Sequence, residues 1–183
     1  NIIYISYFIV LPFLIIVMNI NCKAQNHFHM SEYMLDQSYF NSASIASYDH
    51  ISGSFFMKKQ WIGIDGAPNF QGITIHTPIK KTSNSIGINI INDIIGVNRR
   101  TSASILYSYR LKVNKKDYFS FGSSLSVNML KSNYNLIHTI ESSDPVYNGN
   151  SSFVAPNFSF GLYYFSTKYY IAISCPQLLK NTG

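Results

Sequence analysis

Long runs of alternating apolar and polar residues are the feature that most restricts how this 183-residue chain can fold. In the clearest run, 101–111, every second side chain after Thr101 is apolar or aromatic: Ala103, Ile105, Tyr107, Tyr109 and Leu111. Most of the residues between them are serines. Successive side chains of a β-strand point to opposite faces, so this two-residue period predicts strands with one apolar face. No segment after residue 25 shows a convincing 3.6-residue apolar period, and we therefore predict an all-β chain.

The same period recurs along the chain and predicts about seven strands. The further runs lie within 73–77, 86–90, 119–129, 158–164 and 169–174, with a weaker one at about 54–61. Several runs match the roughly 9 to 11 residues that a tilted membrane strand needs, whereas globular strands average about 5 to 6. Only 12% of the residues are charged, against about 25% in soluble domains, and 15% are aromatic.

We therefore predict an antiparallel transmembrane β-barrel of the outer-membrane type. A secreted soluble β-sandwich is the alternative, since its strands show the same alternation. Strand length favours the barrel. About seven strands form an incomplete barrel, because single-chain bacterial barrels have even strand numbers and an open edge leaves backbone groups unpaired in lipid. We expect the sequence to be the N-terminal part of a longer barrel, since it ends without a terminal aromatic strand, and we expect the first residues of the reading frame to be missing, since it begins at Asn1 and not at Met.

Residues 1–24 have the pattern of a secretory signal peptide. An apolar run to Met18 is followed by a polar patch and the small residues Cys22 and Ala24, which predicts cleavage after Ala24. The alternatives are a transmembrane helix, for which the run is slightly short and contains Pro12, and a lipoprotein acylated at Cys22.

Export places the mature N-terminus in the periplasm, which sets the orientation of the strands. We assign 25–50 to a periplasmic N-terminal segment and 51–183 to the N-terminal part of the barrel. The polar stretch 132–156 follows the fifth expected strand and is therefore predicted to be an outer loop, whereas 112–117 and 166–168 are predicted to be short turns. His76, on the polar face of its strand, is expected to form hydrogen bonds on the lumen side.

The basic residues do not form the clustered face that nucleic-acid binding requires. The chain has 14 Lys and Arg against 8 Asp and Glu, and the basic residues occur as scattered pairs near the ends of apolar runs: Lys58-Lys59, Lys80-Lys81, Arg99-Arg100 and Lys115-Lys116. Charges at the water line of a membrane account for this spacing. We expect contact with outer-membrane lipid and none with nucleic acid.

No catalytic or metal-binding pattern is present in the sequence. It contains no G-x-S-x-G, phosphate loop or H-E-x-x-H motif, and its carboxylates stand mostly in predicted turns. His27 and His29 are the only close histidine pair, and no Asp, Glu or Cys completes a metal site beside them. We expect neither enzymatic activity nor a cofactor.

An ordered series of motifs resembles the PorP/SprF family of type IX secretion and gliding systems. The matching segments are Gln60–Pro68, Ile75–Ile79, Asn92–Thr101, Tyr107–Leu111, Pro156–Gly161 and Tyr169–Pro176. Near the mature N-terminus the family has an Asn-Pro-Ala triplet, which here reads Asn41-Ser42-Ala43.

The resemblance implies a non-enzymatic outer-membrane component of a Gram-negative bacterium that assists export or surface attachment of cargo proteins. Its partners are then type IX secretion components and a secreted adhesin or other cargo. A general porin-like channel is the alternative. The expected lumen faces carry Ser, Asn, Gly and Thr instead of the charge that lines a porin, which favours a filled interior.

Candidate partner-binding residues fall at the ends of two expected strands: Trp61, Gly63, Asp65, Gly66 and Pro68 in a tight turn, and Arg99 and Arg100 at a strand start. A tryptophan at a strand end also suits the membrane interface, and the arginine pair also suits a solvated strand end. The outer loop 132–156 and the segment 25–48 are two further candidate contact surfaces.

The signal peptide gives a direct prediction. We expect N-terminal sequencing of the protein recovered from cells to begin at Gln25, because the small residues at Cys22 and Ala24 suit the signal peptidase site. A mature protein that begins before Cys22 contradicts this prediction, and acylation at Cys22 replaces it with the lipoprotein alternative.

Overall fold

The computed structural model describes residues 36–134 and 150–179. The predicted signal peptide, the histidines His27 and His29, and the centre of the predicted outer loop lie outside the described residues. Among the residues that the structure describes, no helix is long and apolar enough to cross a membrane.

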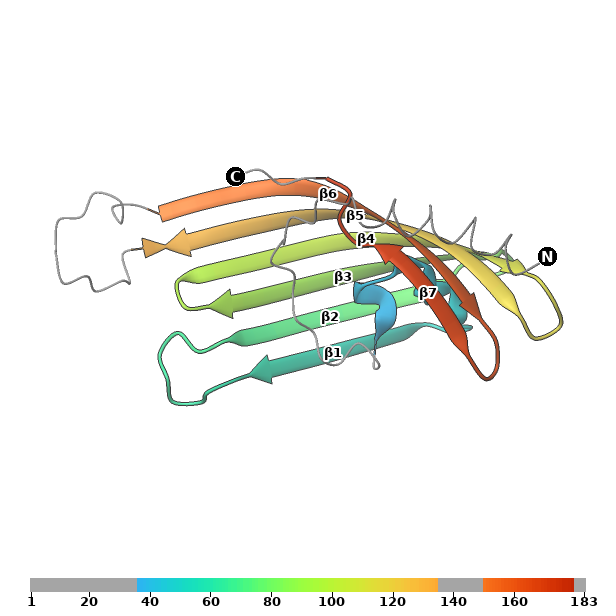
Figure 1. Cartoon of the computed structure of the whole chain (residues 1–183), viewed down its shortest axis with the longest axis horizontal. Helices are drawn as coiled ribbons and strands as arrows, with labels where there is room; N and C mark the ends of the chain where they lie inside the picture. The colour runs from blue at the N-terminus through green and yellow to red at the C-terminus, as the bar shows by residue number, and fades with distance from the viewer. Residues whose placement is uncertain (1–35, 135–149, 180–183) are drawn as a thin grey trace, which may run out of the picture.

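Seven antiparallel strands form one sheet in which each strand pairs with its neighbour in sequence (Figure 1). The strands are β1 (Ser52–Lys59), β2 (Asn69–Pro78), β3 (Asn84–Ile95), β4 (Asn98–Lys112), β5 (Tyr118–Asn133), β6 (Asn150–Phe165) and β7 (Tyr170–Cys175). The expected number of about seven strands is confirmed within the described residues. β4, β5 and β6 have 15, 16 and 16 residues, well beyond the length of an average globular strand.

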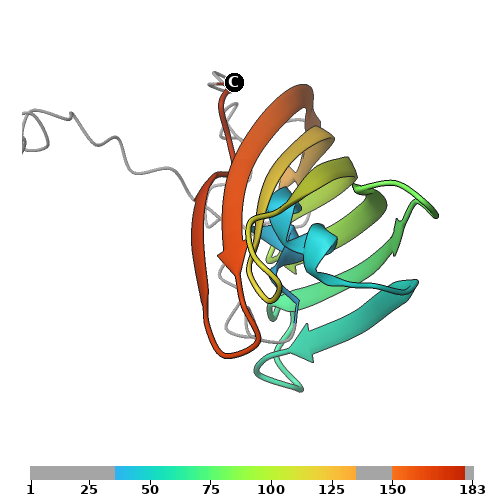
Figure 2. The same ribbon diagram turned by 90° about the vertical axis from the view of Figure 1, so that its right-hand side faces the viewer.

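The sheet curls into a half-barrel with an open concave side (Figure 2). Two short 3₁₀ helices, η1 (Gln37–Tyr39) and η2 (Ser42–Ser47), lie within the curve. β1 and β7 are the two edges of the sheet within the described residues. The predicted fold class, an incomplete antiparallel β-barrel of the outer-membrane type, is confirmed.

The two faces of the sheet have opposite chemistry, as the alternation predicts. On the convex face, large apolar side chains are exposed in row after row: Ile73, Ile88, Ile105, Leu125 and Val127. On the concave face, small polar side chains are buried: Thr74, Asn89, Ser102, Ser108 and Ser120. A soluble sandwich buries its apolar rows, whereas a membrane barrel presents them to lipid. The exposed rows therefore identify the membrane-facing surface.

The boundaries differ from the sequence-based expectation at the long loop. Ladder pairing continues to Ser132↔Ser151 and Asn133↔Asn150, so residues 150–156 belong to β6 and not to the predicted loop 132–156. Backbone pairing extends the strands through polar residues that show no apolar alternation. The short turns at 113–117 and 166–169 are found where they were expected.

The connections divide between two ends of the half-barrel (Figure 1). We call the end that carries residues 60–68 and 96–97 the loop end, and the end that carries 79–83, 113–117 and 166–169 the turn end.

A matched pair of arginine substitutions tests which surface faces lipid. Leu125 on β5 and Val113 in a turn are 57% and 55% exposed. In the full-length protein, Leu125→Arg is expected to destabilise the barrel by about 2–4 kcal/mol, because a lipid-facing charge near the bilayer midplane costs that much. Val113→Arg is expected to have little effect. Heat-modifiable gel migration and urea unfolding in lipid measure the difference, and equal tolerance of both changes contradicts the membrane assignment.

Candidate functional site

The concave face of the half-barrel is occupied by the chain's own N-terminal segment, residues 36–47, which we call the inner segment. Its helix η2 contacts β2, β3, β4, β5 and β6. Ala43 and Ile45 are completely buried. The inner segment thus fills part of the space that would be the lumen. The assignment of 25–50 to the periplasm stays a prediction, and the described part of that segment lies against the sheet.

Local sequence explains why the inner segment forms two short helical turns. Asp36 precedes η1 and Asn41 precedes η2, and both residue types are favoured N-caps. The Asp36 carboxylate accepts a hydrogen bond from the Ser38 backbone N–H at 2.9 Å, and Asn41 Oδ1 accepts one from Ala43 N–H at 2.9 Å. Each cap satisfies a backbone donor that the short helix leaves free.

Two glycines form the seat on which η2 rests. Gly122 of β5 and Gly161 of β6 are direct cross-strand partners. A Cβ atom on Gly122 would lie 2.1 Å from the Ala43 backbone nitrogen, and one on Gly161 would lie 2.0 Å from Asn41 Oδ1. Any larger side chain at either position therefore displaces the inner segment. The glycines are needed because two backbones approach closely here.

Hydrogen bonds attach the seated segment to the sheet. Asn41 Nδ2 donates to the Leu162 carbonyl at 2.9 Å, and Ser120 Oγ donates to the Ala43 carbonyl at 2.9 Å. The Asn41 amide therefore caps η2 with its oxygen and anchors the segment to β6 with its nitrogen. Buried polar groups are costly unless paired, so these contacts make the polar concave face compatible with a filled interior.

Asp36 attaches the other end of the inner segment to β1 and β2. Its carboxylate accepts hydrogen bonds from Ser54 Oγ at 2.6 Å and from Thr74 Oγ1. Burial raises the pKa of the Asp36 carboxyl, but the hydrogen bonds from Ser38, Ser54 and Thr74 together outweigh it, so the pKa lies below its usual value. The group therefore stays ionised and acts as an acceptor at neutral pH.

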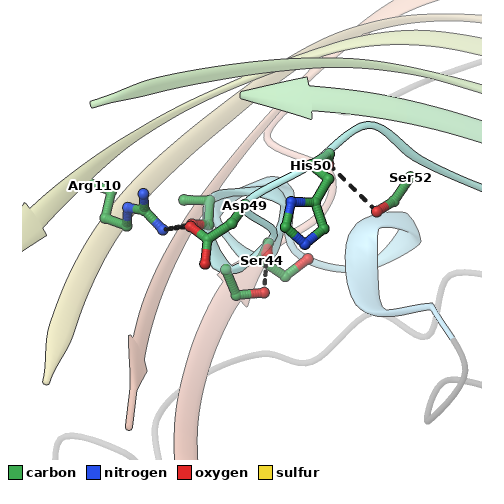
Figure 3. A network of polar contacts seen from close by, with 7 residues as sticks. Ser44, Asp49, His50, Ser52 and Arg110 are labelled. Atoms are coloured by element: carbon green, nitrogen blue, oxygen red, sulfur yellow. Dashed lines mark hydrogen bonds and ion pairs between the residues drawn. The ribbon is translucent and has the colours of Figure 1, made fainter. Parts of the chain in front are cut away.

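Arg110 of β4 holds the chain where it leaves the inner segment (Figure 3). Its Nη1 donates to Asp49 Oδ1 at 2.8 Å and to the Ala46 carbonyl at 3.2 Å. Asp49 is 67% exposed, so the ion pair contributes little stability by itself. Its effect is to direct the path from η2 into β1.

His76 lies on the lumen side, as expected, but the expectation that it forms hydrogen bonds there is wrong. Its ring packs against the Tyr48 ring, with centroids 4.3 Å apart. Among the described residues, neither ring nitrogen has a hydrogen-bond partner. The Tyr48 ring covers the His76 imidazole. This ring contact takes the place of the hydrogen bonds expected from the position of His76 on the polar face of β2.

One cavity beside the inner segment is small and has an uncharged lining. A cavity of about 60 Å³ lies between this segment and the strands. Its lining is mostly serine and asparagine, including Ser102, Ser124, Ser126, Asn89 and Asn157. The lining contains no ionisable pair for acid–base chemistry, and the described residues contain no group of three metal-binding side chains.

The predicted candidates in the first tight turn lie together at the loop end, in the β1–β2 loop. Trp61 has φ 48°, a backbone conformation that is unfavourable for a non-glycine residue, and its side chain is 67% exposed. Gly63 and Gly66 also have positive φ, and Asp65 and Pro68 complete the loop. The Gly96 N–H donates to the Gly66 carbonyl at 2.8 Å, so this loop is joined to the β3–β4 turn.

The structure separates Arg99 from Arg100, which the sequence presents as a pair. Arg100 is opposite Asp93 in the β3–β4 ladder and shares the concave face with Ser102. Arg99 is opposite Lys131 in the β4–β5 ladder and continues the convex row of Ile105. The two arginines are therefore both at the loop end, near the β1–β2 loop, but point to opposite sides of the sheet. Their part in partner binding stays a prediction.

Sequence reasoning missed the residues that hold the inner segment: Asp36, Gly122, Gly161 and Arg110. A partial signal was present for three of them. Gly122 and Gly161 stand on the polar faces of adjacent strands, and Arg110 is the one charged residue of the polar face in 101–111. None of these signals shows which segment they contact.

Together, the exposed apolar rows and the occupied concave face define a membrane β-barrel protein whose interior is lined mostly by small polar side chains and filled in part by its own N-terminal segment. Residues 22–183 match the family model described as type IX secretion system membrane protein PorP/SprF, and the chain belongs to this family. The comparisons with curated proteins and with solved structures gave no match. The chain is thus a membrane component of type IX secretion.

The glycine seat can be tested through the accessibility of η2. With Ile45→Cys as reporter and Cys175→Ser to remove the exposed thiol, the reporter should be protected from maleimide in the full-length protein. Overpacking costs about 1–3 kcal/mol, so Gly122→Ala should raise the labelling rate at least about fivefold.

Gly53→Ala is the matched control, since its Cβ meets no heavy atom closer than 3.2 Å. It should leave the labelling rate unchanged. Equal rates for Gly122→Ala and Gly53→Ala would show that the inner segment does not depend on the seat.

Proposed function

We propose that the protein is a non-enzymatic, outer-membrane component of the type IX machinery that assists export or surface attachment of cargo proteins. It reaches the membrane after cleavage of its signal peptide, and the loop end faces outward. The observation that carries the proposal is the inner segment, which covers the concave face from Asp36 to Ser47 and is seated on Gly122 and Gly161.

An occupied interior lined mostly by small polar side chains suits a partner-binding barrel better than a solute channel. Porin selectivity depends on charged or polar groups that line an open pathway. Here most of the concave side chains are small and neutral and many are buried, and one cavity beside the inner segment has a volume of about 60 Å³. The family membership supports the same conclusion, because it places the chain in a secretion system.

The β1–β2 loop is the proposed contact for a secretion component or a secreted adhesin. Its tip exposes three large apolar side chains, Trp61, Ile62 and Ile64, at 67%, 82% and 63%. Apolar groups that protrude together from a loop favour coverage by a partner. The strained backbone at Trp61 supports a functional role, since strain concentrates at binding sites.

Deletion of the gene should remove one or more type IX cargo proteins from the cell surface or the medium. In gliding cells, it should also abolish the motility that depends on these proteins. Uptake of small solutes should not change, because the interior is filled. Normal cargo export together with reduced solute uptake would instead support the porin-like channel.

Complementation tests the contact loop. In the deletion strain, a gene that carries Trp61→Ser/Ile62→Ser/Ile64→Ser should restore assembly of the barrel but should leave cargo export defective. Ile51→Ser/Val113→Ser removes exposed apolar residues at the turn end, where Ile51 and Val113 are 73% and 55% exposed, and should restore export. Equal restoration by both variants would rule out the loop as the contact.

A further inference from the structure

Two basic residues lie side by side on the lipid-facing side of the loop end. Arg99 of β4 and Lys131 of β5 are direct partners in the ladder. By strand alternation, Arg99 continues the convex row that contains Ile105, and Lys131 continues the row that contains Leu125 and Val127, all of which are exposed. The two cations therefore stand at the end of the apolar band.

This pairing is unfavourable without a counter-ion. Like charges directly opposite each other in a sheet are destabilising. Within the described residues, the side chains of Arg99 and Lys131 have no ion pair or hydrogen bond, whereas the neighbouring Arg100 is opposite Asp93. The convex pair is thus a local concentration of positive charge that an anion would neutralise.

A pocket at the same place gives room for such an anion. It has a volume of about 520 Å³ and is lined by Arg99 and Lys131 together with polar side chains that include Asn98, Ser132, Asn133 and Ser152. Two hydrogen bonds fix its frame. Ser132 Oγ donates to Asn98 Oδ1 at 2.6 Å, and the Asn133 N–H donates to the Val97 carbonyl at 3.0 Å.

We propose that Arg99 and Lys131 bind a phosphate group on the headgroup of an outer-leaflet glycolipid. Arginine and lysine recognise phosphate, and Asn133 and Ser152, which share the convex face with them by strand alternation, suit the sugars of such a headgroup. A lipid is favoured over a protein partner because the pair lies on the convex side, directly next to side chains that face acyl chains. The choice of glycolipid rests on the proposed outer-membrane placement with the loop end outward.

Direct binding to the purified full-length protein in detergent tests this site. The probes are fluorescent lipopolysaccharide and the same lipopolysaccharide after removal of its phosphates. Arg99→Gln/Lys131→Gln should weaken binding of the intact lipid on the order of 30-fold, as expected for two basic residues near a membrane surface. Lys115→Gln/Lys116→Gln is the matched control, since it removes the same charge from a turn at the opposite end, and it should bind as the wild type does.

Charge and phosphate must both matter for the proposal to hold. Arg99→Lys/Lys131→Arg keeps the charge and should retain most of the binding, and dephosphorylated lipid should bind the wild type as weakly as intact lipid binds the Gln variant. Heat-modifiable migration confirms that each variant is folded. Because the assay uses purified protein, its result is independent of whether cargo export depends on this protein.

Four results would overturn the proposal. Equal weakening by both Gln variants would indicate general attraction to net charge, and unchanged binding of the dephosphorylated lipid would exclude phosphate recognition. Inorganic phosphate that competes as tightly as the lipid would indicate a site for a soluble anion. In the fourth result, a polyglutamate peptide binds only when Arg99 and Lys131 are present, while lipid binds equally well without them. That result would assign the pocket to an acidic protein partner.

Discussion

The interior of this barrel is occupied because the Asn41–Ala43 segment makes a close contact with the glycine pair Gly122 and Gly161. Two glycines directly opposite each other leave a flat area on the concave face, and the capped turn at Asn41 fits against it. The buried serines and asparagines around this contact are tolerated because the segment covers them and pairs with several of them. Without the seat, the same polar face would line an open lumen.

The convex face follows from the opposite requirement. Its isoleucines, leucines and valines stay largely exposed within the described residues, and their exposure is stable where lipid surrounds them. The two faces of each strand are thus matched to different environments, the hydrocarbon outside and the chain's own inner segment inside. This division makes both a soluble sandwich and a charge-lined channel poor descriptions of the molecule.

The sequence was sufficient for the parts of the fold that depend on local pattern. The two-residue period in 101–111 and 119–129 predicted the strands and their faces, because alternation is a property of neighbours in the chain. It missed the start of β6 at Asn150, where pairing with Asn133 extends a strand through polar residues. It also left 25–50 without a place against the sheet, because the Asn41 anchor to Leu162 joins residues 121 positions apart. The same limit explains Arg99 and Arg100, whose different surroundings are set by the ladders and not by their shared position in the sequence.

The inner segment also spans the sheet from one side to the other. Asp36 is bound to β1 and β2, whereas Asn41 is bound to β6 and lies within 3.5 Å of the Ile173 carbonyl of β7. A segment attached at both ends opposes flattening of the sheet, since a flatter sheet would pull one attachment away. The six residues from Asp36 to Asn41 therefore help to hold the curvature of the half-barrel, although they belong to none of the strands that they join.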